Sequence, residues 1–412
     1  MKSILLFLLI VTFPALSSAQ TPVSDTSQLF SLSKLSLSAY GSMVYQHFNW
    51  QTFRDKNNSI DNERLVIEPE YAFTKRLFLE IEIEFEHGGT GVTMEFDNEE
   101  EFGEFEIDVE KGGEVQLEEL QLSYQINSHF SLKAGRIPVP VGLVTSNFMP
   151  ADYFSTTYNS VESVLLPTKW YENGLGLEFL FGGNNQFHGE ILLVNGLDAS
   201  GFSSANWVRN GYQLKFETVS ADNFAFVSRL DYRLPNSLSI IGLSAYYGNS
   251  AGNRPKPDME GPAFVGFYDA HAELFLNALT LKSLVLFGTL THADEVSEAN
   301  RNLSNNLNAK RTPVGSASLG YYLEAGYNIL SFFPAKKSIL NVFSGFYYYD
   351  TMAAVTGDVF DNPRWQRNEI RAGLQYIFNN QVSAKADYTH RWLGIPEDNI
   401  EDTYTIGFGF QF

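Results

Sequence analysis

The last eleven residues of the chain, 402–412, read D-T-Y-T-I-G-F-G-F-Q-F. Side chains point to alternate sides of a β-strand, so this stretch has one apolar face and one small, polar face. The apolar face holds Tyr404, Ile406, Phe408, Phe410 and Phe412. A soluble sheet can show the same alternation, but the end of a soluble chain usually frays into water and seldom ends on a Phe. A strand between lipid and a water-filled lumen requires this pattern.

Residues 1–19 are predicted to be a secretory signal peptide. Lys2 supplies the positive charge, 4–11 form the apolar core, and Ser17-Ser18-Ala19 provide a small-residue cleavage site. The apolar run is too short to cross a bilayer as a helix, and no later stretch has about 18 consecutive apolar residues. The alternative is an N-terminal anchor helix.

Composition narrows the class of protein further. The chain has no Cys, which excludes a lipoprotein anchor, disulfides and thiolate metal sites. The formal charge of −20 argues against nucleic acid, which is bound by Lys and Arg patches. Its 34 Phe, 21 Tyr and 5 Trp, in a chain of negative mean hydropathy, are typical of a barrel with an aromatic outer wall. No linker divides 20–412, so we expect a single domain.

Alternating segments separated by short and long connections continue along the chain. Sixteen strands are predicted, at 33–47, 61–73, 76–86, 114–126, 130–137, 170–181, 186–194, 223–234, 237–247, 264–277, 280–292, 316–329, 338–350, 365–378, 381–391 and 401–412. Segment 208–219 also has strand propensity, but a seventeenth strand would break the alternation, so it is assigned to an outer loop at about 195–222. The alternation slips at Glu118-Glu119, which suggests a bulge. The predicted fold is all-β, a transmembrane antiparallel β-barrel with short periplasmic turns and long outer loops.

Two motifs carry a resemblance to a known family. They are G-R-I-P-V-P-V-G at 135–142 and W-Y-E-N-G-L-G-L-E-F at 170–179. With these motifs and its terminal Phe, which is typical of bacterial outer-membrane barrels, the chain resembles the phosphate-selective porin O and P family, particularly members from Bacteroidetes-type bacteria. The resemblance implies a sixteen-stranded, usually trimeric channel for small ions or anionic solutes. The many pore-lining Lys and Arg of phosphate-selective members are not matched here.

Segment 138–168 is the candidate constriction loop. It is too long for a simple hairpin, and Pro138 and Pro140 stiffen its start. In the family that it resembles, the corresponding loop folds into the lumen. Its candidate pore-narrowing residues are Phe148, Asp152, Tyr153, Phe154 and Tyr158. The alternative is an ordinary outer loop that packs on a neighbouring subunit.

Charged residues at inward-facing positions give a predicted lumen lining. The candidates are Arg229, Arg233, Arg367, Arg371, Lys385, Arg391, Lys34, Arg136, Lys169, Glu80, Glu82 and Glu84. One arc of the wall is acidic and another is basic, which would place a transverse field across the pore. We hypothesise that Arg229, Arg233, Arg367 and Arg371 form an anion-attracting track. Alternatively, the charges are solvated or paired with neighbours.

Metal and catalytic sites are not predicted. The loop 95–114 carries ten carboxylates against Lys111, which is either a solvated acidic loop or a weak divalent-cation site beside lipopolysaccharide. Asp269, His271 and Glu273 alternate along one strand, a spacing too wide for one ion to reach all three. The seven His residues fit no catalytic motif, so neither enzyme activity nor a cofactor is expected.

The sequence thus predicts a porin of the bacterial outer membrane. It would allow passive diffusion of small hydrophilic solutes. The family resemblance and the hypothesised arginine track suggest that these solutes include anions. Its expected partners are membrane lipid, lipopolysaccharide and two further copies in a homotrimer. The alternative is a structural or adhesive barrel with a plugged, non-conducting lumen.

Overall fold

The computed structural model describes most of the chain. The described residues are 31–89, 97–101, 104–106, 114–167, 169–213, 219–303, 311–333 and 338–412. The predicted signal peptide lies outside them, as does much of the acidic loop 95–114.

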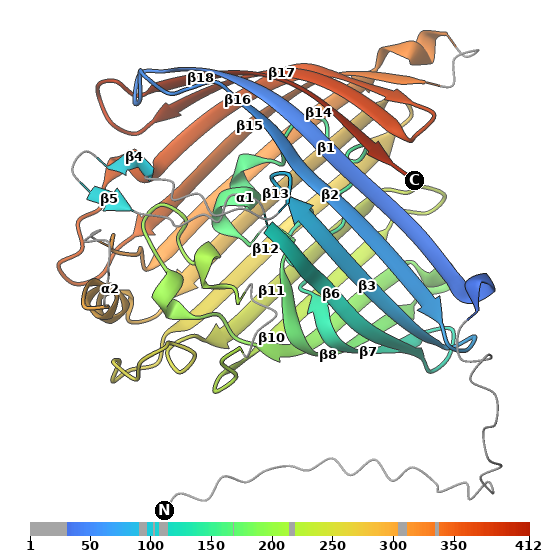
Figure 1. The fold of residues 1–412 in the computed structure, drawn as a ribbon, viewed down its shortest axis with the longest axis horizontal. Helices are drawn as coiled ribbons and strands as arrows, with labels where there is room; N and C mark the ends of the chain where they lie inside the picture. The colour runs from blue at the N-terminus through green and yellow to red at the C-terminus, as the bar shows by residue number, and fades with distance from the viewer. Residues whose placement is uncertain are drawn as a thin grey trace, which may run out of the picture.

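Sixteen antiparallel strands form one closed barrel (Figure 1). The barrel strands are β1 (Leu35–Trp50), β2 (Ser59–Ala72), β3 (Leu77–Glu86), β6 (Glu114–Gln125), β7 (Phe130–Pro138), β8 (Tyr171–Phe181), β9 (Phe187–Asn195), β10 (Phe224–Arg233), β11 (Ile240–Asn249), β12 (Phe264–Leu276), β13 (Leu279–Leu290), β14 (Ala317–Asn328), β15 (Ile339–Ala354), β16 (Gln366–Phe378), β17 (Val382–Leu393) and β18 (Ile400–Gln411). The predicted fold class and strand count are confirmed, and each predicted strand lies within a few residues of an observed one.

The C-terminal strand closes the barrel. β18 pairs with β1 in antiparallel register, from Tyr40 opposite Gln411 to Trp50 opposite Glu401. The pairing continues to the chain end, because the amide of Phe412 donates to the carbonyl of Ala39 at 2.9 Å. Closure leaves neither strand with an unpaired edge, which is what a sheet within a membrane requires.

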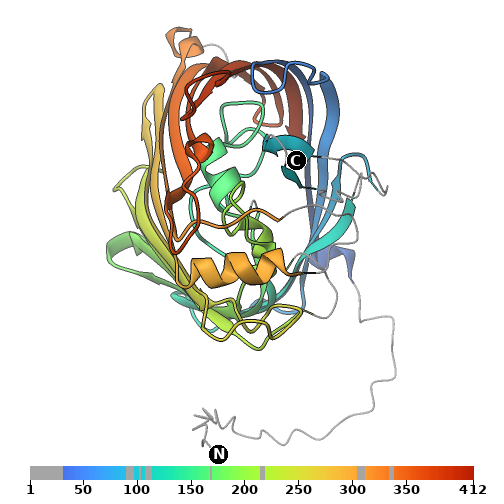
Figure 2. The ribbon, with the colours of Figure 1, turned by 90° about the vertical axis from the view of Figure 1, so that its left-hand side faces the viewer.

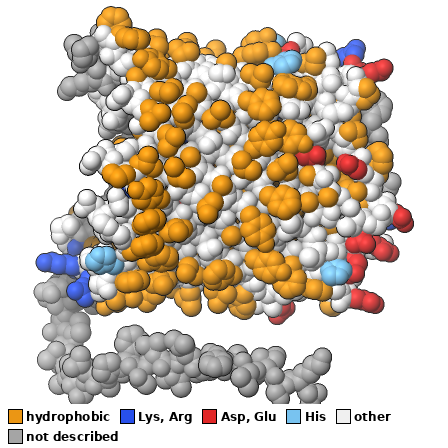
Figure 3. Space-filling view, turned by 180° about the vertical axis from the view of Figure 1, so that it is seen from behind, with side chains coloured by type: hydrophobic (Ala, Val, Ile, Leu, Met, Phe, Trp, Pro, Cys, Tyr) orange, Lys and Arg blue, Asp and Glu red, His pale blue; other side chains and the backbone are white. Residues whose placement is uncertain are grey.

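Exposed apolar side chains occur on every barrel strand except β3, and Figure 3 shows this belt on one side of the molecule. On β18, Ile406 is 63% exposed, and on β11 Leu243 is 62% exposed. A belt this extensive would be strongly unfavourable in water, at roughly 25 cal/mol for each Å² of apolar surface. Lipid therefore covers the outer face, as the alternation in 402–412 predicts.

The two ends of the barrel differ in the length of their connections. At one end, short turns join the strands, and residues such as Asn236 and Asn379 adopt the left-handed conformation that tight turns need. The chain reaches β1 and leaves β18 at this short-turn end. Long connections lie at the other end, the long-loop end, as predicted.

Two details of the strand prediction can be compared with the structure. In β6 the register shifts at Glu118, so the predicted bulge is present. Segment 208–219 lies in the connection between β9 and β10. Its described part contains a short 3-10 helix, η5 (Arg209–Gly211), and no barrel strand.

Helices are few and lie in the connections. α1 (Ser160–Leu165) follows β7, and α2 (Ala293–Arg301) follows β13. The shorter 3-10 helices are η2 (Leu32–Lys34), η3 (Gly183–Asn185), η4 (Ala199–Gly201), η6 (Ile329–Phe332) and η7 (Pro363–Trp365). A small sheet pairs β4 (Asp97–Glu101) with β5 (Glu104–Glu106) in the acidic loop. Within the described ranges, no helix is long and apolar enough to cross a membrane.

One part of the inner wall is apolar, which the alternation did not predict. Inward residues at the long-loop end of β9–β13 are buried, and they pack with the loops inside the barrel. This inner core includes Leu192, Val194, Val227, Val265, Phe267, Leu284 and Leu286, together with Trp170, Trp207 and Val296 from the connections. These strands therefore alternate between two apolar environments, lipid outside and a packed loop inside, so the expectation of a polar inner face is wrong for this region.

Candidate functional site

A glycine inside β7, close to the point where the connection to β8 begins, cannot be replaced by another residue without strain. Gly135 has a φ of +127°, and a Cβ there would lie 2.1 Å from the carbonyl oxygen of Leu120. Next to it, Arg136 is buried and donates from Nε to the carbonyl of Glu118 at 2.8 Å. The guanidinium also donates to the carbonyl of Gln213 at 3.2 Å. The Gly-Arg pair thus fixes the last part of β7, just before the chain turns inward.

Residues 139–167, which we call the inner loop, lie inside the barrel (Figure 2). Its contacts reach distant strands. The Phe148 ring centroid lies 5.5 Å from that of Tyr40 on β1. On the other side, Val161 and Leu165 of α1 pack so closely on β14 that a Cβ at Gly320 would lie 2.6 Å from Val161. The inner loop therefore crosses the lumen from wall to wall.

Basic side chains of the wall donate to backbone carbonyls of the inner loop. Lys385 Nζ donates to Tyr153 at 2.7 Å and to Ser155 at 2.8 Å. Arg229 Nη1 donates to Gly142 at 2.6 Å. These two side chains come from β17 and β10, which lie well apart around the barrel.

Two further strands provide the same kind of contact. Lys282 Nζ, on β13, donates to the carbonyl of Asp152. Arg371 Nη1, on β16, donates to the Ser155 hydroxyl at 2.9 Å and the Tyr158 carbonyl at 3.3 Å. The anchoring cations are Arg229, Lys282, Arg371 and Lys385. All are buried, and carbonyl dipoles help to solvate their charges.

Carboxylates compensate three of the anchoring cations directly. Arg229 Nε lies 2.9 Å from Asp231, and Arg371 Nη2 lies 2.8 Å from Glu369. Lys282 Nζ lies 2.8 Å from Glu273. The fourth, Lys385, neighbours Asp387, whose carboxylate accepts from the amide of Thr156 at 2.7 Å. A buried charge left unpaired would cost several kcal/mol, which explains this pairing.

Glu162 joins the two halves of the inner loop. Its Oε1 accepts from the amides of Leu143 at 2.6 Å and Val144 at 2.9 Å. Its Oε2 accepts from the Tyr322 hydroxyl on β14 at 2.9 Å. Asn159 caps α1 by accepting from the amide of Glu162. One buried carboxylate thus fixes the start of the loop, the start of α1 and the wall.

The aromatic residues proposed to narrow the pore lie on the inner loop, and several of them contact one another. Tyr153 and Tyr158 have ring centroids 4.8 Å apart, and the Tyr158 hydroxyl donates to the Phe148 carbonyl at 2.8 Å. Phe154 stacks on Phe343 of β15 at 5.7 Å. Arg64 on β2 donates to the Tyr158 hydroxyl at 3.2 Å.

Lys169 lies where the inner loop rejoins the wall. Its Nζ contacts Glu82 and, at 3.3 Å, Glu84, both on β3. The Tyr171 hydroxyl donates to Glu82 at 2.7 Å, and Arg64 lies 3.4 Å from Glu84. The structure thus brings three of the predicted lumen residues, Lys169, Glu82 and Glu84, into one buried cluster.

The other predicted residues are dispersed. Arg391 pairs with Glu401, and Glu80 accepts from Gln121 at 2.8 Å and from Ser123. The Arg367 guanidinium lies 4.7 Å from the Trp365 ring centroid. Lys34 lies outside the strands, in η2, and donates to the carbonyl of Phe73 at 3.2 Å.

The four arginines of the hypothesised anion track do not form one row. Arg229 is on β10 and Arg371 on β16, six strands apart in the barrel order, and both are bonded to carboxylates and to the inner loop. Arg233 lies at the short-turn end of β10, whereas Arg367 lies at the long-loop end of β16.

Asp269 and His271 belong to a hydrogen-bonded network. His271 Nδ1 lies 2.6 Å from Asp269 and Nε2 lies 2.9 Å from Asp231, while Glu273 pairs with Lys282. The Ser244 hydroxyl donates to Asp269 and not to His271, so this is not a nucleophilic arrangement. Among the described residues, no group of three potential ligands is placed to hold a metal ion.

Sequence reasoning missed two contributors. Lys282 was not singled out, although its inward position on β13 was available from the alternation. The apolar inner core left a weaker signal, since residues 191–194, I-L-L-V, do not alternate. Such a continuous run indicates a strand that is buried on both faces.

Geometry and surface together define the class of protein: a sixteen-stranded β-barrel of the outer membrane. No protein-family model matches the sequence. An uncharacterized protein from Aquifex aeolicus (strain VF5) is 27% identical over 395 residues, covering 94% of this chain and 82% of that protein. The resemblance to the phosphate-selective porin O and P family therefore stays a prediction.

Solved structures agree in fold. OmpF of Salmonella typhi, in complex with daunomycin, is 14% identical with a TM-score of 0.54, over 92% of this chain and 97% of that chain. An anion-selective porin from Comamonas acidovorans is 9% identical with a TM-score of 0.53, over 92% and 99%. The trimer form of OmpT from Vibrio cholerae is 10% identical with a TM-score of 0.50, over 92% of this chain and 99% of that chain.

Proposed function

We propose that the protein is a porin that passes small hydrophilic solutes through a lumen narrowed by the inner loop. The observation that carries this proposal is the wall-to-wall course of residues 139–167, held by basic side chains from four strands. A barrel of sixteen strands is too wide for side chains alone to fill. The largest solute that can pass therefore depends on the loop that crosses the lumen. The architecture of solved porins supports a channel in preference to an enzyme.

Anion preference receives less support than it did from the sequence. Arg229 and Arg371 are compensated by Asp231 and Glu369, so their fields fall off quickly with distance. The proposal is therefore confined to small hydrophilic solutes. Reversal potentials in a salt gradient measure the ionic preference directly.

A homotrimer in contact with outer-membrane lipid and lipopolysaccharide is part of the proposal. The trimer form of Vibrio cholerae OmpT, which shares this fold, supports it. Sedimentation of the detergent-solubilised barrel tests the number of copies.

Conductance in planar bilayers is the decisive experiment. The purified barrel is expected to give stable stepwise openings, and the double variant Arg371→Ala/Lys385→Ala is expected to give larger or noisier ones. Arg54→Ala is the control, because Arg54 is exposed and pairs with the exposed Asp398. Silence from a folded barrel contradicts the porin proposal.

The second candidate, a plugged structural barrel, is favoured by a different observation. The inner loop packs on the apolar inner core through residues such as Val141, Leu143 and Val161, which would exclude water from that side of the lumen. This candidate expects a silent barrel whose double variant is silent as well.

A further inference from the structure

The inner loop meets the wall of β17 and β18 with almost no space left between them. The Thr156 hydroxyl donates to that of Thr405 at 2.8 Å, and a Cβ at Gly409 would lie 2.4 Å from Pro150. The cavity that remains at this contact, beside Lys385, measures about 10 Å³ and holds one water at most. Solutes therefore do not pass on this side of the loop.

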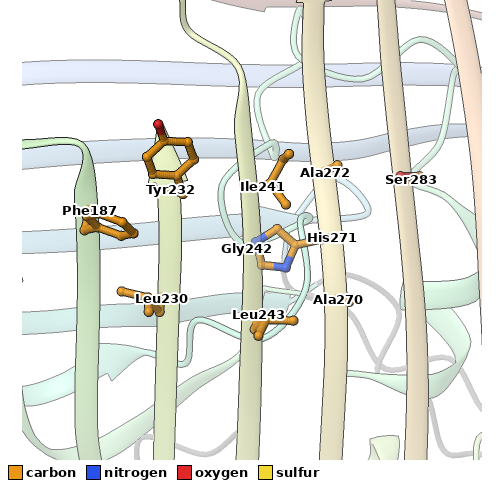
Figure 4. A pocket seen from close by; sticks show the side chains of 10 residues that line it. All are labelled: Phe187, Leu230, Tyr232, Ile241, Gly242, Leu243, Ala270, His271, Ala272 and Ser283. Atoms are coloured by element: carbon orange, nitrogen blue, oxygen red, sulfur yellow. The ribbon is translucent and has the colours of Figure 1, made fainter. Parts of the chain in front are cut away.

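Toward β10–β13 the inner loop is closed to solutes as well. Both backbone groups of Gly142 are bonded to the wall, because its amide donates to Asp269 at 3.1 Å and its carbonyl accepts from Arg229 at 2.6 Å. Around these bonds the loop packs on the apolar inner core. A hollow of about 520 Å³ at β10–β13 (Figure 4) is bordered by Leu230 and Leu243, which are exposed on the lipid face, so it offers no path through the barrel.

The contact of the inner loop with β2, β3 and β6 is of a different kind. Within the described ranges, no backbone group of the loop forms a hydrogen bond with these strands. Side chains alone reach across: Arg64 donates to the Tyr158 hydroxyl at 3.2 Å. Just after the loop, Lys169 contacts Glu82 and Glu84. In this sector a gap opens when side chains move, whereas elsewhere the backbone of the loop would have to move.

A polar hollow continues from this contact toward the short-turn end. It measures about 220 Å³ and lies on the inner face, because Tyr40, two residues along β1 from Ser38, contacts Phe148 of the inner loop. Its lining residues at inward positions are Ser36, Ser38, Glu68, Glu70, Glu80 and Glu119. Glu80 precedes Glu82 on the inward face of β3, so the hollow adjoins the contact with the loop.

The hollow carries negative charge that the wall does not compensate. Glu70 lies directly opposite Glu80 in the register, and Glu119 lies opposite Glu82. Like charges at opposed positions destabilise a sheet, so this arrangement is costly for the wall itself. In the described part of the chain, no Lys or Arg forms an ion pair with Glu68, Glu70, Glu80 or Glu119. Carboxylates that line a pore favour cations over anions.

We propose that solutes cross the barrel between the inner loop and the wall of β2, β3 and β6, that this path prefers cations, and that Lys169 is its narrowest point. The backbone of Lys169 is in the left-handed region, at a φ of +52°, which residues other than Gly seldom adopt. The surrounding contacts therefore hold its ammonium in the path. This proposal rests on the porin function and adds the sign of charge that the solutes carry.

Single cysteines test the course of the path, because the chain has no Cys of its own. Ser38→Cys places a thiol in the hollow, and a cationic methanethiosulfonate should then lower the conductance of the barrel in planar bilayers. The anionic reagent should react about tenfold more slowly. Ser383→Cys is the matched control, since Ser383 is an inward serine, 1% exposed, at the closed contact with β17. The control should not react.

Two further measurements test the charges. In a salt gradient the reversal potential of the wild type should show a preference for cations, and Glu68→Gln/Glu80→Gln should reduce that preference. Lys169→Met should enlarge the conductance steps. Lys133→Met should leave them unchanged, because Lys133 pairs with two glutamates of the wall itself, each at 3.2 Å.

Each outcome decides a separate point. Silence from a folded wild-type barrel contradicts the porin function and this path together. Stepwise openings that stay unblocked in Ser38→Cys, or that are blocked in Ser383→Cys, overturn the path alone. A reversal potential of zero or of anionic sign overturns the charge preference, and unchanged steps in Lys169→Met overturn its role as the narrowest point.

Discussion

Lys385 contacts Tyr153 in two ways. Its Nζ donates to the Tyr153 carbonyl at 2.7 Å and lies 3.5 Å from the centroid of the Tyr153 ring. One side chain of the wall thus holds both the backbone and an aromatic ring of the inner loop. Cation–ring contacts of this kind contribute about 2 kcal/mol or more where water is excluded.

Replacement of Lys385 by Met should loosen the inner loop without leaving a large void. The carbonyls of Tyr153 and Ser155 lose their donor, and each unpaired buried acceptor costs about 1–3 kcal/mol. We expect noisier single-channel current and a lower midpoint of unfolding by guanidinium. Lys75→Met, in an exposed turn at the short-turn end, is the control. An unchanged midpoint and unchanged current would show that Lys385 does not hold the loop.

Glu162→Ala should destabilise the inner loop more than any single cation variant. The substitution leaves the amides of Leu143 and Val144 and the hydroxyl of Tyr322 without their acceptor, at a total cost of about 3 kcal/mol or more. Cleavage of the loop by an added protease is the measurement, and cleavage should become faster. Glu298→Ala on α2 changes the same residue type at an exposed position. Equal resistance of both variants would contradict the proposed role of Glu162.

Gly135→Ala should impair folding of the barrel. The residue has a φ of +127°, and the added methyl group would meet the Leu120 carbonyl at 2.1 Å. An L-residue is strained at this φ, and its Cβ also clashes with the carbonyl, so the backbone of β6 or β7 has to shift. The yield of heat-modifiable barrel after refolding into detergent measures the effect. Gly183→Ala is the control, because a Cβ there meets nothing within 4 Å.

The outer connection 250–263 should open at low pH. Its buried Arg254 forms an ion pair and hydrogen bonds with Asp258, which lower the pKa of that carboxyl below its ordinary value. The pair therefore contributes fully above the ordinary pKa of Asp, about 3.9, and its contribution is lost as the pH falls through the lowered pKa. Because Asp258 is largely exposed, the effect should stay local.

Limited proteolysis at neutral pH and near pH 2, with an acid-active protease at the lower value, measures this opening. Asp258→Asn should be as susceptible at neutral pH as the wild type is in acid. If the variant is as resistant as wild type at neutral pH, the ion pair does not hold this connection.

Much of the barrel could be predicted from sequence because its two periodicities are local. The period-two alternation along residues 402–412 assigns one face to lipid. The alternation of short turns with long loops assigns each connection to one end of the barrel. Even the bulge at Glu118 and the exclusion of 208–213, the described start of that segment, from the wall followed from these patterns. Parity also assigned Arg371 and Lys385 to the inward face, and in the structure both donate to the inner loop.

What these inward charges contact was decided by the tertiary structure alone. Parity places Arg229 and Arg371 in the lumen, but it does not place the inner loop, whose carbonyls and neighbouring carboxylates take up their charge. The apolar inner core depends on the same loop, because Leu192 and Val265 can face inward only where something dry covers them. A repeating pattern in a strand is set by its two immediate surroundings, whereas the course of a loop is set by side chains that lie hundreds of residues apart in the sequence. The sequence by itself therefore determined the wall, and only the folded barrel determined what fills it.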